Sequence, residues 1–225
     1  RSLWRTRHLG VQVTRALCLL ATTALAFASL KLVSLADYTA VLMLTPLVVG
    51  VAATALLGES ATRRQWLYMA VSFMGALLVI RPGGHPTGWA SLLPLAMVAT
   101  NAAYQLLTAR LARDEDPQTM QLYTGLVGLV VMSMLLPVAW ATPSTAVVWA
   151  ALLAMCVFSV LGHLLLIRAY ALTAASRVAP LLYAQIVFAL LIDWLAFGRT
   201  PDAWSWVGVA LISGFGVAAA AQRSR

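Results

Sequence analysis

Polar side chains inside long apolar runs are the residues of this sequence that could bind a solute. Asn101 and Gln105 stand at positions i and i+4, and Tyr104 follows Asn101 by three residues, so a helix places the three on one side. This spacing predicts either the wall of a central cavity or a set of hydrogen bonds between helices. Tyr183 and Gln185 are two residues apart and should point to different faces of a helix, so at most one of them is expected to face a cavity.

One carboxylate and one histidine lie within apolar runs, where a charge is costly and a function is the first hypothesis. Asp193 stands four residues before the end of its run. It is either a carboxylate that reaches water at the membrane surface, near Arg199, or a coupling group that binds and releases a proton or another cation. His163 is either a hydrogen-bonded contact between helices or a proton relay, because imidazole can change its charge near neutral pH.

The dipeptide Thr45-Pro46 interrupts another apolar run. Proline inside a helix removes one hydrogen bond and leaves a backbone carbonyl without its usual donor. Such freed groups are tolerated in a membrane where protein lines a cavity, so Thr45 is a candidate for solute binding. The alternative is an ordinary membrane proline whose freed group is satisfied by the threonine hydroxyl.

The sequence lacks the residue patterns of membrane enzymes. Its apolar runs hold one histidine and one carboxylate, with no HExxH motif, nucleophile elbow or paired acidic motif. Cys18 and Cys156 lie in apolar runs without metal-ligand spacing, and no disulfide is expected between them. The acidic turn Asp114–Asp116 predicts a solvated loop, with loose Mg²⁺ binding as the alternative. We therefore expect no catalytic residue, no resident metal and no cofactor, and keep a membrane-embedded enzyme or a structural membrane subunit as alternatives.

Eight apolar stretches, separated by short loops, must position these residues. Most are close to the ~20 residues that a helix needs to cross about 30 Å of hydrocarbon. The chain is 62% hydrophobic and 10% charged with a mean hydropathy of +0.88, whereas a soluble domain carries about 25% charged residues. These features predict an all-α membrane protein, a polytopic helix bundle with eight transmembrane helices. The stretches are Ala16–Ser34, Tyr38–Leu57, Trp66–Ile80, Gly88–Thr108, Met120–Ala141, Val147–Ile167, Val178–Phe197 and Ala203–Ala221.

The loops between these stretches alternate between arginine-rich and arginine-poor. Of the 15 lysines and arginines, twelve fall on one side and three on the other. Because basic loops stay in the cytoplasm, we expect an integral protein of the plasma membrane, the inner membrane of a bacterium, with both ends of this chain cytoplasmic. The arginines are scattered over five short segments and form no single patch, so no nucleic-acid partner is expected. The twelve are Arg1, Arg5, Arg7, Arg15, Arg63, Arg64, Arg110, Arg113, Arg168, Arg177, Arg223 and Arg225, and the three are Lys31, Arg81 and Arg199.

The sequence repeats itself at an offset of 140 residues. The offset spans five helices, and an odd number inserts the second copy in the opposite direction, as in the inverted repeats of many secondary transporters. The first copy has only three helices here, so we expect two more before Arg1, ten in the natural protein, and poor transport by this portion alone. The predicted division is residues 1–82 and residues 83–225. The identical pairs are Leu42 and Leu182, Gly58 and Gly198, Trp66 and Trp206, and Ala70 and Ala210.

Three segments of the chain resemble the EamA-type members of the drug/metabolite transporter superfamily. Two residues depart from the family pattern: Arg199 stands where the second repeat usually has glutamate, and Asp193 lies in a helix that is normally uncharged. The first segment runs from Thr45-Pro46-Leu47 through Leu57-Gly58-Glu59, Gln65-Trp66 and Gly75 to Ile80-Arg81-Pro82-Gly83; the second runs from Ala99-Thr100-Asn101 to Arg113; the third runs from Arg168-Ala169-Tyr170 through Ala179-Pro180-Leu181 to Phe197-Gly198.

The resemblance implies a ten-helix carrier built as a 5+5 inverted repeat, of which this chain holds eight helices. Its solute would be a small-molecule metabolite, such as an amino acid or a related compound. The halves would rock around a site near the membrane midplane, which is alternating access. The expected partners are this metabolite and the lipid bilayer, and a homodimer is left open.

Overall fold

The computed structural model describes residues 6–81, 88–140, 142–198 and 200–221, and these ranges fold into helices joined by short turns. Arg1, Arg5, Arg199, Arg223, Arg225 and the Pro82–Thr87 segment lie outside the described residues. The helices are α1 (Leu9–Leu32), α2 (Leu35–Leu42), α3 (Leu44–Leu56), α4 (Arg63–Ile80), the 3₁₀ helix η1 (Gly88–Ser91), α5 (Leu92–Leu111), α6 (Pro117–Ala139), α7 (Ala146–Leu172), α8 (Ala175–Val178), the 3₁₀ helix η2 (Ala179–Tyr183), α9 (Ala184–Phe197) and α10 (Ala203–Ala220).

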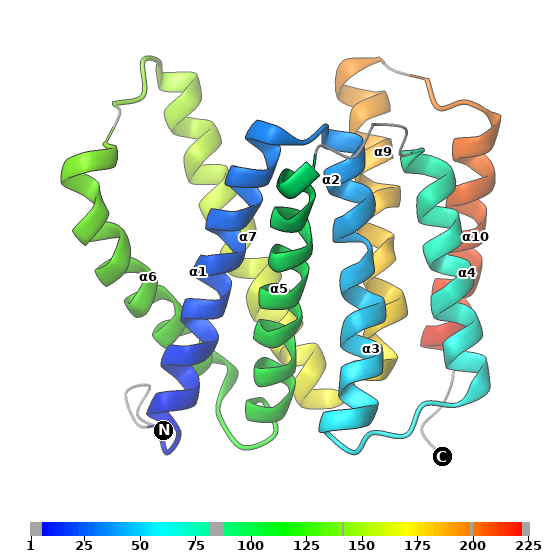
Figure 1. The fold of residues 1–225 in the computed structure, drawn as a ribbon, viewed down its shortest axis with the longest axis horizontal. Helices are drawn as coiled ribbons and strands as arrows, with labels where there is room; N and C mark the ends of the chain where they lie inside the picture. Colours follow the sequence, from blue (N-terminus) through cyan, green and yellow to red (C-terminus); the bar gives the residue numbers. More distant parts are fainter. Residues whose placement is uncertain (1–5, 82–87, 141, 199, 222–225) are drawn as a thin grey trace.

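The predicted all-α membrane bundle is confirmed. Six helical stretches of the described residues are long and apolar enough to cross a membrane, and Ala203–Ala219 is a shorter apolar helix. α2 with α3, and α8 with η2 and α9, each form one broken span. Figure 1 shows the helices standing side by side, with the start of α1 and the end of α10 at the same end of the bundle, called the base here; the opposite end is the top.

The start of the first helix differs from the prediction. α1 begins at Leu9, not at Ala16, so Arg15 lies within the helix and its side chain is fully buried. The charge pattern wrongly placed Arg15 in a loop. An apolar run ends at a charged residue, but a helix can continue through that residue where neighbouring helices accept its hydrogen bonds. Arg168, counted with the loops for the same reason, lies within α7.

Helix boundaries recur at the offset of 140. A glycine with positive φ follows the end of α3 and the end of α9, Gly58 at 66° and Gly198 at 68°, a conformation that favours glycine. Thr62 and Asp202 then cap the next helix by accepting a backbone N–H. α3 runs from top to base while α9 runs from base to top (Figure 1). The division at residues 82 and 83 stays a prediction. The paired helix starts are Leu35 and Ala175, Leu44 and Ala184, and Arg63 and Ala203.

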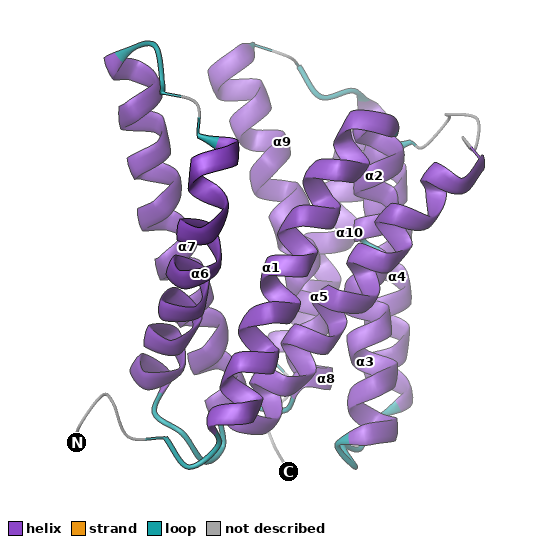
Figure 2. Ribbon diagram, turned by 60° about the vertical axis from the view of Figure 1, so that its left-hand side comes forward, coloured by secondary structure: helices purple, strands orange, loops and turns teal. Residues whose placement is uncertain are grey.

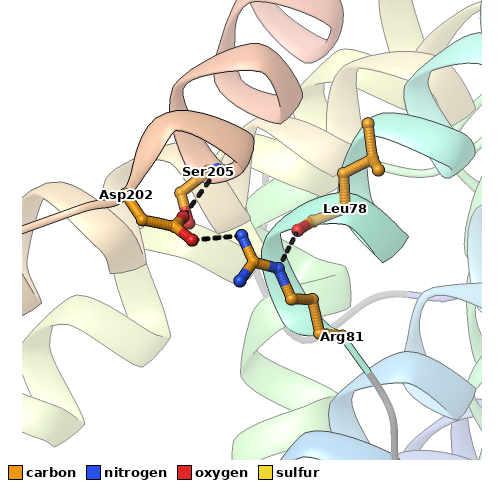
Figure 3. Close-up of polar contacts among 4 residues, drawn as sticks. All are labelled: Leu78, Arg81, Asp202 and Ser205. Carbon is orange, nitrogen blue, oxygen red and sulfur yellow. Dashed lines mark hydrogen bonds and ion pairs between the residues drawn. The ribbon is translucent and has the colours of Figure 1, made fainter.

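α4 and α10 pack with their backbones in contact. A Cβ atom on Gly208 would lie 2.5 Å from the carbonyl oxygen of Gly75, and one on Gly75 would lie 2.9 Å from the carbonyl oxygen of Gly208. Small residues permit this close approach between membrane helices. At the top, an ion pair of 2.5 Å between Arg81 Nη2 and Asp202 Oδ2 joins the end of α4 to the start of α10. Arg81 Nε also donates to the carbonyl of Leu78 (Figure 3).

The Arg81–Asp202 ion pair predicts an acid-sensitive contribution to stability. Hydrogen bonds from Arg81 and then from Ser205 lower the pKa of Asp202 from 3.8 to about 2. The pKa is lowered in the folded state, so the stabilisation is complete above the unfolded value and is lost as the pH falls through about 2. Asp202→Asn keeps a capping group but removes the charge. We expect its melting temperature in detergent to lie below that of the wild type at pH 7 and to converge with it between pH 4 and pH 2. A constant difference over this range would contradict the assignment.

Two clusters of buried apolar side chains form the core of the bundle. One buried cluster joins α3, α5, α6, α7 and α8, with Val49, Ala109 and Ile167 among its members. A second joins α4, η2, α9 and α10 and includes Met69, Tyr183 and Ile212. α6 and α7 form the outer edge beside α1 (Figure 2), and their apolar side chains are mostly exposed. A group of buried polar side chains lies beside the first cluster, where α1 meets α5 and α6.

Candidate functional site

Arg15 is the centre of a group of buried polar side chains in the base half of the bundle. Its Nη2 donates to the carbonyl of Met120 at 2.5 Å, to Thr124 Oγ1 at 2.7 Å and to Gln12 Oε1 at 3.2 Å. Its Nη1 donates to Thr108 Oγ1 at 3.5 Å. The guanidinium therefore links α1 to α5 and α6, and every one of these acceptors is neutral.

Tyr104 connects this arginine to α7. The Arg15 guanidinium carbon lies 5.6 Å from the centroid of the Tyr104 ring, which is a cation–π geometry. The same ring meets the His163 ring edge-on at a centroid distance of 5.8 Å. Arg15 and Tyr104 are buried, whereas His163 is partly exposed and its Nδ1 lies 2.8 Å from the carbonyl of Ser159. The three side chains form a row from the interior of the bundle to a more open face.

Gln105 and Asn101 extend the group along α5. The Tyr170 hydroxyl donates to Gln105 Oε1 at 2.6 Å, and Gln105 Nε2 donates to Asn101 Oδ1 at 3.2 Å. The structure thus brings His163, which the sequence had selected separately, together with Asn101, Tyr104 and Gln105. We call the whole group the polar cluster; its members are Gln12, Arg15, Asn101, Tyr104, Gln105, Thr108, Thr124, His163 and Tyr170.

Several buried atoms of the polar cluster have no hydrogen-bond partner among the described residues. They are Arg15 Nε, Gln12 Nε2 and Tyr104 Oη. Buried polar atoms are nearly always paired in folded proteins, so an unpaired set in one place points to a missing partner. Two of the three atoms can only donate, which favours a partner rich in acceptors.

The remaining sequence-selected residues of the interior meet at the break between α2 and α3. The Tyr183 hydroxyl donates to the carbonyl of Met43 at 3.1 Å, and Gln185 Nε2 lies 3.9 Å from Met43 Sδ. Tyr183 and Gln185, which their spacing put on different faces, thus both reach Met43, because the chain changes from η2 to α9 between them. Thr45 is buried nearby in α3, and its hydroxyl has no partner among the described residues.

Asp193 lies near the top, in the second half of α9, and is partly exposed. It belongs neither to the polar cluster nor to the group at Met43. A coupling role for Asp193 stays a prediction.

Glu59 closes the base of the bundle. Its Oε1 accepts from Arg113 Nη2 at 2.7 Å and from the backbone N–H of Ala175 at 3.1 Å, and its Oε2 accepts from the N–H of Ser176 at 3.0 Å. The Glu59 side chain is 4% exposed and that of Arg113 is 50% exposed. One carboxylate thus ties the loop after α3 to the end of α5 and the start of α8; we call these contacts the base latch.

Sequence reasoning did not assign a role to Arg15, Glu59 or Tyr170. Glu59 did carry a signal, a glycine–glutamate pair directly after an apolar run. Tyr170 stood in one of the segments that resemble the family, without a role of its own, and Arg15 was counted only among the basic residues of the loops. The acidic turn proves structural: Asp116 caps α6, and Glu115 accepts from Thr6 and the N–H of Arg7. Within the described ranges no three His, Cys, Asp or Glu residues are grouped as metal ligands, so the Mg²⁺ alternative gains no support.

Comparison with known proteins gives a consistent result. The sequence model of the EamA-like transporter family matches residues 3–81 and 88–218. The riboflavin transporter of Vibrio cholerae is 30% identical over 174 residues, which are 77% of this chain and 58% of that protein. The pseudopaline exporter CntI of Pseudomonas aeruginosa is 28% identical over 191 residues, 83% of this chain and 66% of that protein. The chain therefore spans less than two thirds of the length of these relatives.

A solved crystal structure has the same fold. It superposes with a TM-score of 0.83 over 99% of this chain and 80% of that chain, at 19% sequence identity. At this identity the similarity concerns the fold alone.

Proposed function

The chain belongs to the EamA-like transporter family, and from this premise we propose that it carries a small metabolite across the plasma membrane by alternating access. The relatives named above are transporters, which removes the membrane-enzyme alternative. The finer proposal is an amino acid or a related compound as the solute. The observation that carries this proposal is the polar cluster, because buried, partly unpaired polar groups in a membrane bundle mark solute pathways.

The contacts of the polar cluster suit a carrier whose two halves move relative to one another. Arg15 belongs to α1, in the first copy, whereas Thr108, Met120 and Thr124 belong to α5 and α6, in the second. The base latch also crosses between the copies, from Glu59 to α5 and α8. Rocking of one copy against the other would exchange these contacts, which is the change that alternating access requires.

We place the base in the cytoplasm. Among the described residues, Arg7, Arg15, Arg63, Arg64, Arg110, Arg113, Arg168 and Arg177 lie towards the base, whereas Lys31 and Arg81 lie at the top. An excess of basic residues marks the cytoplasmic side. This orientation puts the base latch on the cytoplasmic side and the Arg81–Asp202 ion pair on the outer side.

Counterflow into liposomes tests the proposed function. Protein is reconstituted in vesicles preloaded with one unlabelled solute, and entry of the same labelled solute is followed. Riboflavin is tested because a relative transports it, and L-leucine and L-phenylalanine represent the proposed class. We expect accelerated entry of at least one solute, only with protein and only after preloading. Equal entry of every solute with and without protein would contradict the proposal.

A further inference from the structure

We propose that Arg15 binds an anionic group of the transported solute, a carboxylate in the first instance, and so makes the carrier selective for solutes that bear one. This inference rests on the proposed function, because it assigns a solute class to the same polar cluster. The charge of Arg15 is neutralised by none of its described neighbours.

The guanidinium of Arg15 is 0% exposed, and an arginine side chain keeps its charge in proteins. Neither of the two ion pairs found among the described residues, Arg81–Asp202 and Arg113–Glu59, includes Arg15. Its contacts are hydroxyls, an amide oxygen, a carbonyl and the face of the Tyr104 ring, which stabilise a cation without cancelling it. Buried charges are normally paired, so the site as it stands carries an excess positive charge.

The geometry around Arg15 leaves donors available for an anion. Nη2 has three acceptors, but Nη1 has one long contact of 3.5 Å and Nε has none. Gln12 Nε2 and Tyr104 Oη also have no hydrogen-bond partner among the described residues. A carboxylate offers two oxygens that match the arginine fork, with lone pairs left for the neighbouring donors. A cationic group would meet repulsion here and fill none of these donors.

A purely structural arginine explains these contacts less well. An arginine that only links helices is expected to use all its N–H donors, since each unpaired buried donor costs stability. The groups on α5 and α6 that accept hydrogen bonds from Arg15 belong to the second copy. Movement of that copy would take these acceptors away from α1. A carboxylate that enters as they leave would keep the guanidinium paired through the cycle. His163, which meets the same Tyr104 ring, is partly exposed.

Binding of matched solute pairs tests the proposal without requiring transport. Purified protein in nanodiscs is titrated with L-leucine and with L-leucinamide, and with succinate and succinamide, and the dissociation constant is read from thermal stabilisation. We expect at least one carboxylate to bind about tenfold or more tightly than its amide. Arg15→Gln should remove this difference, and Arg15→Lys should retain part of it. Arg110→Gln, at an exposed position near the same end of α5, serves as the control and should leave it unchanged.

Three outcomes would overturn the proposal. They are equal binding of every carboxylate and its amide, a carboxylate–amide difference in Arg15→Gln as large as in the wild type, or an Arg110→Gln control that loses this difference to the same extent as Arg15→Gln. If Arg15→Gln does not fold, Arg15→Lys is used instead. A difference between carboxylate and amide binding as large as that of the wild type would overturn the proposal, and a smaller difference would support it. The outcomes separate this inference from the proposed function. Arg15-dependent carboxylate binding without counterflow would refute transport alone, whereas counterflow that is unchanged by Arg15→Gln would refute the anion site alone.

Discussion

Glu59→Gln is expected to destabilise the protein by about 2–4 kcal/mol and to open the base of the bundle. The carboxylate accepts three hydrogen bonds from two separate segments, and glutamine lacks the charge and one of the two acceptor oxygens. The N–H groups of Ala175 and Ser176, at the start of α8, would lose a partner that helix N-termini favour. Arg113 is half exposed and is rehydrated, which keeps the loss below that of a fully buried pair.

Thiol labelling measures this opening. Ser176 is 2% exposed, so a cysteine placed there should react slowly in a protein from which Cys18 and Cys156 have been removed. We expect Glu59→Gln to raise its labelling rate at least about tenfold, as a shift of 1.4 kcal/mol requires. Asp114→Asn, an exposed carboxylate at the same end, is the matched control and should have no effect. An unchanged rate in Glu59→Gln would show that the base latch does not hold the bundle closed.

Gly208→Ala is expected to lower the free energy of unfolding by about 1–3 kcal/mol. The added Cβ would lie 2.5 Å from the carbonyl oxygen of Gly75 and 2.7 Å from a methyl group of Val79, so α4 and α10 must separate. A backbone carbonyl cannot swing aside as a long side chain can. The separation also strains the Arg81–Asp202 ion pair, which joins the same two helices at the top.

Gly214→Ala is the matched control, because it lies in the same helix with nothing within 4 Å of the added Cβ. Alanine has the higher helix propensity by up to about 1 kcal/mol, so this variant should be neutral or more stable. The two substitutions are thus expected to have opposite signs in the same unfolding assay, for example urea titration in mixed micelles. A stabilised Gly208→Ala protein would mean that α4 and α10 do not touch at this point.

The class of fold was predictable because it depends on quantities that the sequence states directly. Run length and hydropathy define the spans. The recurrence of Gly58 and Gly198 at one offset marks where helices end. The i and i+4 spacing of Asn101 and Gln105 placed them on one side, and their side chains are indeed hydrogen-bonded to each other.

The functional groups were less predictable because their partners are distant along the chain. Glu59 meets Arg113 and Ala175, which follow it by 54 and 116 residues. Arg15 was misplaced because its guanidinium donates hydrogen bonds to Thr108, Met120 and Thr124, contacts that hydropathy does not register. A membrane span predicted from composition therefore stops at such a charged residue, although the folded helix continues beyond it.

Sided labelling of an equivalent pair of positions tests whether the two copies insert in opposite directions. Ser60 and Thr200 are separated by the repeat offset of 140 and are both exposed, one after α3 and one after α9. Each is replaced by cysteine in the protein without Cys18 and Cys156, and intact cells receive a thiol reagent that cannot cross the membrane. We expect labelling of Thr200→Cys and protection of Ser60→Cys until the cells are opened. Labelling of both positions from the outside would contradict it.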